Sequence, residues 1–432
     1  MQRVAVIGAG AAGLSAARYL SAKPNSFEPV VFEKSDRIGG TWVYTGETGI
    51  DQYGLPIHSS MYKNLKTNLP KEVMAFPDFP FDSSLPSFVT HKDVLDYLDQ
   101  YAAQFNLLQY IKFKTVVECV KPVTNGETTL WEVTVRGVTD KANGTQTSVF
   151  DAVIVCNGHY SVPKMPKLKG EETFTGTILH SHNYRKPEDF KDSTVVCVGA
   201  GASGQDIVLD MHPHAKMVYL SHWKATLASE FPKNVAQVPV IDHLSGSKVV
   251  FTDGQSCEAD TILLCTGYEF IFPFLTKECR VTVSEDQIVS PLYKHLIHAE
   301  FPSLSFIGIP IRILPFPQFS LQARLIIAVL EGSFKLPSKV DVEADNTSDL
   351  QKRLDMGWPR RYAHLLGSLQ WEYNNQIAQL AGTTPINPVI EYLYDEVSYH
   401  RHNNVCHYKK QNYELVDEKN WREVTRQNSG DA

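Results

Sequence analysis

The fold is decided by the stretch Arg3-Val-Ala-Val-Ile7-Gly8-Ala9-Gly10-Ala11-Ala12-Gly13. Its first five residues are mostly apolar and β-branched, as in a strand buried inside a parallel sheet. The next six form a G-x-G-x-x-G pattern, and residues 14–22 have helical character. A strand, a tight glycine turn and a helix in this order predict a Rossmann-like unit that binds a dinucleotide pyrophosphate at the helix N-terminus. The predicted contacts are Gly8, Ala9, Gly10, Ala11, Ala12 and Gly13.

An acidic residue stands where such a unit binds the ribose. The next strand, residues 29–32, ends at Glu33, which lies about 20 residues after the last glycine of the turn. A carboxylate there accepts hydrogen bonds from a ribose diol and repels a 2′-phosphate, so this site favours FAD or NAD over NADP. Gly40 completes a second glycine pair, which Thr41 and Trp42 follow, and the pair predicts another close backbone approach to the same dinucleotide. A plain loop turn is the alternative for that pair.

The same fingerprint occurs a second time. The strand-like run of residues 194–198 leads into Gly199-Ala-Gly201-Ala-Ser203-Gly204, and a helical segment continues through Gln205 and Asp206. These six named residues are predicted to contact a second dinucleotide. The following strand ends in Ser221-His222-Trp223-Lys224 and carries no acid. The hydroxyl, imidazole and ammonium groups of Ser221, His222 and Lys224 suit a 2′-phosphate, which favours NADPH, although ordinary surface charges are the alternative.

Two fingerprints predict an α/β fold with two Rossmann-like dinucleotide-binding domains, the NADP domain inserted in the FAD domain. We expect an FAD-binding domain made of residues 1–163 and 291–432, and an NADPH-binding domain of residues 164–290. Further local signals predict a capped helix after Thr90, a hairpin at Asn125-Gly126, one strand over residues 148–155 and a helix over residues 319–330.

The composition excludes several classes of protein. The chain has 432 residues, a net charge of −7 and 43% hydrophobic residues, so it is a globular protein with no electrostatic footprint for nucleic acid. No apolar run reaches the ~18–20 residues that cross a bilayer, so we expect no transmembrane anchor. The seven cysteines are scattered without a C-x-x-C pair, which indicates reduced thiols and a cytoplasmic location. A secreted chain that has lost a signal peptide is the alternative, and the oligomeric state, including a homo-oligomer, stays open.

The segment before the second fingerprint carries a longer pattern. Phe174, Gly176, His180 and Tyr184 form F-x-G-x-x-x-H-x-x-x-Y. With this pattern, and with its Gly39-Gly40-Thr41-Trp42, Thr67-Asn68-Leu-Pro70 and Cys265-Thr-Gly267-Tyr268 segments, the chain resembles the flavin-containing monooxygenases from Val4 to about Gly332. Its short form is similar to yeast, bacterial and insect members, and most to the insect enzymes that N-oxidise pyrrolizidine alkaloids.

The resemblance implies a function and roles for residues. It implies FAD at the first fingerprint and NADPH at the second, with O₂ converted on the flavin to a C4a-hydroperoxide that oxygenates an amine nitrogen or a sulfide sulfur. Asn68 matches the asparagine beside the flavin and the nicotinamide, and Thr67 precedes it. Gln318 corresponds to a segment near the pyrimidine end of the flavin. We predict that Asn68 is the catalytic residue, which donates hydrogen bonds through its amide; a simple turn residue is the alternative.

Other interpretations stay open at this point. A Baeyer–Villiger monooxygenase of ketones normally has Trp where this chain has Tyr184, and a flavoprotein disulfide reductase needs a closely spaced cysteine pair. A non-catalytic flavin-binding module is a third alternative. His180 is expected to be a structural hydrogen-bond partner rather than a general base. A metal site at His400, His402, Cys406 and His407 is disfavoured by their irregular spacing, so no metal is expected.

Overall fold

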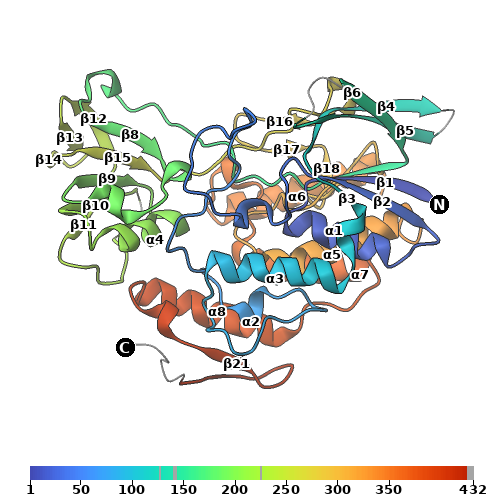
Figure 1. Cartoon of the computed structure of the whole chain (residues 1–432). Helices are drawn as coiled ribbons and strands as arrows, with labels where there is room; N and C mark the ends of the chain where they lie inside the picture. The colour runs from blue at the N-terminus through green and yellow to red at the C-terminus, as the bar shows by residue number, and fades with distance from the viewer. Residues whose placement is uncertain (126–127, 140–143, 224–225, 426–432) are drawn as a thin grey trace.

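Two sheets, a larger one of mixed pairing and a smaller parallel one, organise the chain in the computed structural model, which describes residues 1–125, 128–139, 144–223 and 226–425 (Figure 1). The larger sheet has the order β18 (Leu292–Tyr293), β19 (Ile297–His298), β20 (Leu304–Phe306), β7 (Ala152–Val155), β1 (Gln2–Ile7), β2 (Phe27–Phe32) and β3 (Ile111–Lys112). The smaller sheet has the order β11 (Val235–Val238), β10 (Met217–Ser221), β9 (Thr194–Val198), β15 (Thr261–Leu264) and β8 (Thr177–His180). Each sheet forms the centre of a Rossmann-like unit, so the predicted fold class is confirmed.

The chain leaves the larger sheet and later returns to it. Strands β1, β2, β3 and β7 precede residue 156, the five strands of the smaller sheet lie between residues 177 and 264, and β18–β20 follow residue 291. Figure 1 shows the smaller sheet on one side of the molecule and the larger sheet on the other. The domain boundaries near residues 163 and 290 stay a prediction.

Helices cover the sheets with their apolar faces. Those against the larger sheet and its neighbouring core are α1 (Ala11–Ser21), α3 (His91–Gln104), α5 (Pro315–Leu330) and α7 (Gln370–Leu380). Helix α4 (Ala202–Met211) packs on the smaller sheet through Ile207, Val208 and Met211. The predicted cap of α3 is present, since the Thr90 hydroxyl accepts the Asp93 amide and the Asp93 carboxylate accepts the Thr90 amide at 2.8 Å.

Small antiparallel sheets are attached to this frame. They are formed by β4 (Thr115–Asn125), β5 (Thr128–Gly137) and β6 (Thr145–Phe150); by β12 (Ile241–Ser245), β13 (Lys248–Phe251) and β14 (Ser256–Glu258); by β16 (Thr282–Val283) and β17 (Val289–Ser290); and by β21 (Tyr413–Leu415) and β22 (Trp421–Glu423). Strands β4 and β5 pair as the Asn125-Gly126 prediction requires, although Gly126 lies outside the described residues.

Two sequence predictions need correction. Residues 148–155 do not form one strand, because the chain passes from β6 to β7, and therefore from one sheet to another, at Asp151. The Asp151 carboxylate accepts the Arg3 amide at 2.7 Å, which fixes the change of direction. The second correction concerns α5, which begins at Pro315 rather than at residue 319. Proline suits the first helical position because its fixed φ is helical and the amide it lacks would have no partner there.

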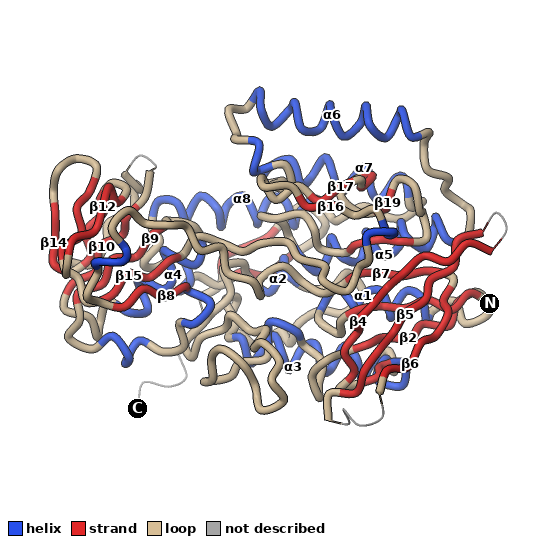
Figure 2. Tube along the Cα trace, turned by 90° about the horizontal axis from the view of Figure 1, so that it is seen from above, coloured by secondary structure: helices blue, strands red, loops and turns tan. Residues whose placement is uncertain are grey.

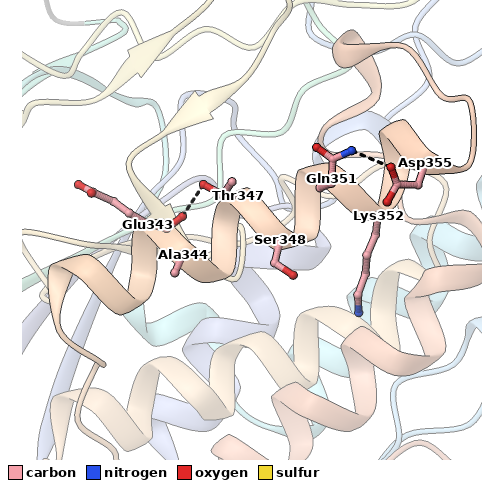
Figure 3. Close-up of a pocket in the computed structure, with 7 residues that line it drawn as sticks. All are labelled: Glu343, Ala344, Thr347, Ser348, Gln351, Lys352 and Asp355. Carbon is pink, nitrogen blue, oxygen red and sulfur yellow. Dashed lines mark hydrogen bonds between the residues drawn. The ribbon is translucent and has the colours of Figure 1, made fainter.

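The C-terminal third adds α6 (Lys339–Asp355) and α8 (Pro388–Asn403). Figure 2 shows α6 as an outlying helix at one edge of the molecule. A shallow pocket follows its outward face, lined by polar side chains that include Thr347, Ser348 and Gln351 (Figure 3). None of the residues that line it belongs to either glycine turn. Within the described ranges, no helix combines the length and the apolarity that crossing a bilayer demands.

Candidate functional site

The two glycine turns are geometric copies of one another. Gly8 and Gly199 adopt φ values of 107° and 110°, which favour glycine. A Cβ on Gly8 would lie 2.6 Å from the carbonyl oxygen of Cys156, and a Cβ on Gly199 would lie 2.6 Å from that of Cys265. In each half, therefore, the first glycine lets the turn pass directly over the end of the neighbouring strand.

The last glycine of each turn is constrained even more strongly. A Cβ on Gly13 would lie 1.8 Å from the Gly8 carbonyl oxygen, and a Cβ on Gly204 would lie 1.8 Å from the Gly199 carbonyl oxygen. No real contact is this short, so only glycine lets α1 and α4 begin this close to their strands.

The middle glycines leave two open helix ends. Gly10 and Gly201 are the N-cap residues of α1 and α4, and neither helix has a side-chain cap. A Cβ on Gly201 would meet no atom within 4 Å, and a Cβ on Gly10 would meet only Gly40, at 3.6 Å or more. Free amides, the positive end of the helix dipole and space for phosphates coincide at both ends, which fits a dinucleotide pyrophosphate. Ala11 and Ala12 begin α1, and Ser203 is exposed in the first turn of α4.

The two turns differ in the residue that follows the second strand. Glu33 is buried, its Oε2 accepts the Ala9 amide at 2.8 Å, and its Oε1 accepts the Ser35 amide at 2.9 Å. His222 takes the equivalent place in the second half, where its Nε2 lies 3.1 Å from Gln237 and its Nδ1 has no hydrogen-bond partner. The residue that follows the second strand thus carries a carboxylate in the first half and an imidazole in the second.

The second glycine pair folds over the first turn. The Gly39 amide donates to the Ala9 carbonyl oxygen at 3.1 Å, and a Cβ on Gly40 would lie 3.1 Å from the Cα of Gly10. Thr41 and Trp42 continue as a short 3₁₀ helix. The structure thus places Gly40 beside the first glycine turn, and its approach to the dinucleotide stays a prediction.

Thr67, Asn68 and Gln318 are half-buried or buried polar residues of the larger domain. The Thr67 hydroxyl is buried and has no hydrogen-bond partner, and the same holds for Oε1 of the fully buried Gln318. Asn68 is half-buried, and its Oδ1 accepts the Tyr408 hydroxyl at 3.4 Å. The two atoms of Thr67 and Gln318 lack a partner within the protein, as do other buried polar atoms of the described residues, and a bound molecule within reach would complete their hydrogen bonding.

The other residues predicted to contact the second dinucleotide differ in their surroundings. Gln205 donates to the Ala200 carbonyl oxygen at 3.0 Å, beside the turn. Asp206 binds the Lys409 ammonium and the Tyr62 hydroxyl, so its carboxylate faces other protein groups. Ser221 is buried, and its hydroxyl donates to the Pro239 carbonyl oxygen at 2.8 Å. Lys224 lies outside the described residues.

The residues of the longer pattern have structural contacts. His180 is buried, and its Nδ1 accepts the His182 amide at 3.0 Å. Burial lowers the pKa of His180 to about 4, so the ring is neutral near pH 7 and is a weak base. The Tyr184 hydroxyl donates to the Asp210 carboxylate of α4 at 2.7 Å. A Cβ on Gly176 would lie 2.4 Å from the Asp260 carbonyl oxygen.

Two cysteines far apart in the sequence are neighbours in space. Cys197 and Cys265 have their sulfur atoms 3.5 Å apart, beneath α4. The adjacent Cys265 thiol and burial raise the pKa of Cys197 well above its ordinary value, so it is a poor thiolate. Within the described residues, no three His, Cys, Asp or Glu side chains lie close enough to hold a metal ion. His400 instead pairs with Glu396 at 2.9 Å.

The sequence analysis missed two residues at the edge of this site, Tyr408 and Lys409. They contact Asn68 and Asp206, respectively, from the far end of the chain. No periodicity, spacing or turn signal near residue 408 points to such a contact, because it arises only from tertiary packing.

Comparison with known proteins identifies relatives over nearly the whole chain. A family model described as flavin-binding monooxygenase-like matches residues 1–230 and 231–422. The flavin-containing monooxygenase FMO GS-OX5 of Arabidopsis thaliana is 40% identical over 407 residues, covering 88% of this chain and 85% of that protein. The FMO GS-OX4 protein of the same plant is 41% identical over 402 residues, with 88% and 85% covered.

Solved structures extend this finding to the fold. S-allyl-L-cysteine S-oxygenase from Allium sativum superposes with a TM-score of 0.88 at 37% identity, covering 95% of each chain. Tmm from a Pelagibacter strain gives a TM-score of 0.86 at 29% identity, covering 99% of this chain and 97% of that one. A cyclohexanone monooxygenase, at 15% identity and a TM-score of 0.59, covers 88% of this chain and 98% of its own, and shares the fold alone.

Proposed function

The chain belongs to the flavin-binding monooxygenase-like family and is a flavin monooxygenase, and from this premise we propose that it uses FAD, NADPH and O₂ to oxygenate soft nucleophiles. The proposed product is a sulfoxide or an amine N-oxide. A bound FAD would supply the redox chemistry, namely the transfer of electrons from NADPH to O₂.

The cofactor assignment rests on the contrast between Glu33 and His222. The first open helix end has a buried carboxylate beside it, which suits the ribose hydroxyls of FAD and disfavours a 2′-phosphate. The second has an imidazole with an unpartnered nitrogen, which can donate to the 2′-phosphate of NADPH. Two turns of the same geometry, one followed by the Glu33 carboxylate and the other by the His222 imidazole, fit two different dinucleotides. This single observation carries the proposal.

The chain's own residues would then bind and orient the two cofactors and exclude water from them. The backbone amides after Gly10 and Gly201 bind the two pyrophosphates. The unpartnered Thr67 hydroxyl and Gln318 Oε1 complete their hydrogen bonds on the flavin side. The Asn68 amide donates to the place where flavin and nicotinamide meet, because its oxygen already has a donor in Tyr408. The protein needs no acid–base triad for this chemistry, which is carried by the cofactor.

Sulfide sulfur is the substrate class we place first. The Allium relative is named for S-oxygenation of S-allyl-L-cysteine, and its chain matches this one over 95% of both lengths. Tertiary amine nitrogen, including that of pyrrolizidine alkaloids, is the second class, since its lone pair is also nucleophilic and the sequence pattern resembles N-oxygenases. Ketone oxidation and disulfide reduction are less favoured, because Tyr184 replaces the usual Trp and the Cys197–Cys265 thiols are packed beneath α4.

A product assay tests the proposal. The purified chain is loaded with FAD and supplied with NADPH, air and one probe at a time: a thioether amino acid, a tertiary amine alkaloid or a cyclic ketone. We expect NADPH oxidation, and mass spectrometry should find the thioether or the amine heavier by one oxygen atom. Lactone from the ketone as the main product, or no flavin binding at all, would contradict the proposal.

A further inference from the structure

Two consecutive residues near the C-terminus contact the loop that carries Asn68. The Tyr408 hydroxyl lies 3.4 Å from Asn68 Oδ1, and the Lys409 ammonium donates to the Lys66 carbonyl oxygen at 2.9 Å. Lys409 also forms an ion pair with Asp206 of α4. Building on the proposed function, we infer that Tyr408 and Lys409 are positioning residues, of which Tyr408 orients the Asn68 amide and Lys409 fastens the NADPH-binding helix to the Asn68 loop.

The Tyr408 contact decides which way the Asn68 amide faces. An asparagine side chain has an acceptor oxygen on one side and a donor NH₂ on the other. Tyr408 is buried, burial raises the pKa of its hydroxyl, and the protonated hydroxyl donates to Asn68 Oδ1 in this structure. A donor facing Oδ1 selects the rotamer in which the NH₂ group of Asn68 points away from Tyr408. That group is then free to donate to a bound cofactor.

The Lys409 contacts join two parts of the site. The ammonium and the Asp206 carboxylate are largely shielded from water, with exposed side-chain fractions of 16% and 19%. Asp206 lies two residues after Gly204, the last glycine of the second turn, and it also accepts the Tyr62 hydroxyl. The Asp206 carboxylate of α4 therefore has two partners: Tyr62, six residues before Asn68 in the sequence, and Lys409, near the C-terminus. This arrangement fixes the second turn relative to Asn68.

The segment that carries both residues is anchored at each end. We call residues 402–413 the C-terminal strap. At its start, the Ser229 hydroxyl donates to the His402 carbonyl oxygen at 2.8 Å and accepts the Val405 amide at 3.0 Å. At its end, the Tyr413 amide donates to the Ser87 hydroxyl at 2.8 Å. Ser229 lies between β10 and β11 of the smaller sheet, whereas Ser87 lies between α2 (Lys71–Met74) and α3, so the strap joins the two halves of the chain. Tyr408 and Lys409 sit at the middle of this span.

The first experiment removes one hydroxyl in the holoenzyme. Tyr408→Phe keeps the ring and deletes the donor to Asn68, while Tyr413→Phe deletes a hydroxyl of the same strap that donates only to Gln411 at 2.8 Å. We expect Tyr408→Phe to raise the share of oxidised NADPH that ends as hydrogen peroxide by about 2- to 10-fold, the range for one lost hydrogen bond. In the absence of NADPH, the backbone amides of residues 64–70 should exchange hydrogen faster in Tyr408→Phe than in Tyr413→Phe.

The second experiment changes the ammonium. Lys409→Met removes the charge, Lys409→Arg keeps it, and Lys410→Met is the control at the exposed neighbouring residue. Isothermal titration of NADP⁺ into the oxidised holoenzyme should give an about 3- to 10-fold weaker Kd for Lys409→Met. Lys409→Arg should recover most of the affinity, which a purely structural defect of the strap would not allow.

Each outcome bears on a different claim. If the wild-type chain binds no FAD or does not oxidise NADPH, the proposed function fails. If the wild-type chain is active but Tyr408→Phe matches Tyr413→Phe in peroxide release and exchange, the role of Tyr408 is wrong. If Lys409→Met matches Lys410→Met in NADP⁺ affinity, the role of Lys409 is wrong. Thermal midpoints of all variants identify any protein that fails to fold, and the Lys409→Arg comparison then still tests the role of the charge.

Discussion

Glu33 and His222 are structural counterparts in the two halves of the chain. Glu33 follows Phe32, whose carbonyl oxygen accepts the Gly8 amide at 2.8 Å. His222 follows Ser221, whose carbonyl oxygen accepts the Gly199 amide at the same distance. The two turns are otherwise alike, so this one position distinguishes the dinucleotide that each turn would select.

Replacing the imidazole by a carboxylate should therefore change cofactor preference. We expect His222→Glu to lower kcat/KM for NADPH relative to NADH by about 10- to 100-fold, because a charge-assisted hydrogen bond is lost and repulsion of the 2′-phosphate is gained. Steady-state kinetics with both cofactors measure the ratio. His243→Glu makes the same change of residue on strand β12, where His243 is half-exposed, and should leave the ratio unaltered. An unchanged ratio in His222→Glu would contradict NADPH binding at this turn.

The middle and last glycines of the second turn should fail in different ways. A Cβ on Gly204 would lie 1.8 Å from the Gly199 carbonyl oxygen, so Gly204→Ala should shift α4 and lower the thermal midpoint by several degrees. A Cβ on Gly201 meets nothing within 4 Å, so Gly201→Ala should keep the thermal midpoint and lose NADP⁺ affinity by occupying the open helix end. Thermal unfolding and isothermal titration of NADP⁺ measure the two effects.

Gly46→Ala is the matched control for both glycine variants. A Cβ there also meets nothing within 4 Å, and the residue is outside both turns. It should change neither the thermal midpoint nor the NADP⁺ affinity. If Gly201→Ala bound NADP⁺ as tightly as Gly46→Ala does, the phosphates would not lie at the N-terminus of α4.

The sequence predicted the two turns because everything that builds them is local. A strand of consecutive apolar residues, three glycines and a helix lie within about 20 residues in each half, and their order fixes the geometry. Strand β9 begins and ends at the predicted residues, and β1 differs by one residue. The place of Gly40 beside Gly10 was also predictable, since the second glycine pair follows the same unit in the chain.

Contacts between distant segments were not predictable from one sequence. Asn68 and Tyr408 are separated by 340 residues, and Cys197 and Cys265 by 68, so no period or spacing links them. The change of sheet at Asp151 was missed because apolar residues continue on both sides of it, and only hydrogen bonding to Arg3 reveals the break. Strands and turns could therefore be predicted from neighbouring residues, whereas the contacts of Asn68 and Cys197 with distant segments depend on tertiary packing.

A carboxylate at position 68 should uncouple NADPH oxidation from oxygenation. Asn68→Asp keeps the size of the side chain and removes both N–H donors. We expect hydrogen peroxide to account for about 2- to 10-fold more of the oxidised NADPH, while the Kd for NADP⁺ changes little. A peroxide assay beside NADPH absorbance measures the share. Asn346→Asp, on the outlying helix α6, is the control, and Asn68→Asp with normal coupling would show that Asn68 is only a turn residue.

The pH dependence of stability should report the burial of His180. Its pKa in the folded protein is about 4 because burial disfavours the charged ring, against 6.5 for an ordinary histidine. As pH falls below 6.5 the unfolded chain binds the proton first, so stability declines between about pH 6.5 and about pH 4. His180→Asn keeps an acceptor for the His182 amide and cannot titrate, so its thermal midpoint should fall less over this range. The half-exposed His243 supplies the control, since His243→Asn should behave as wild type. A His180→Asn protein that keeps its midpoint but loses turnover would instead make His180 a general base.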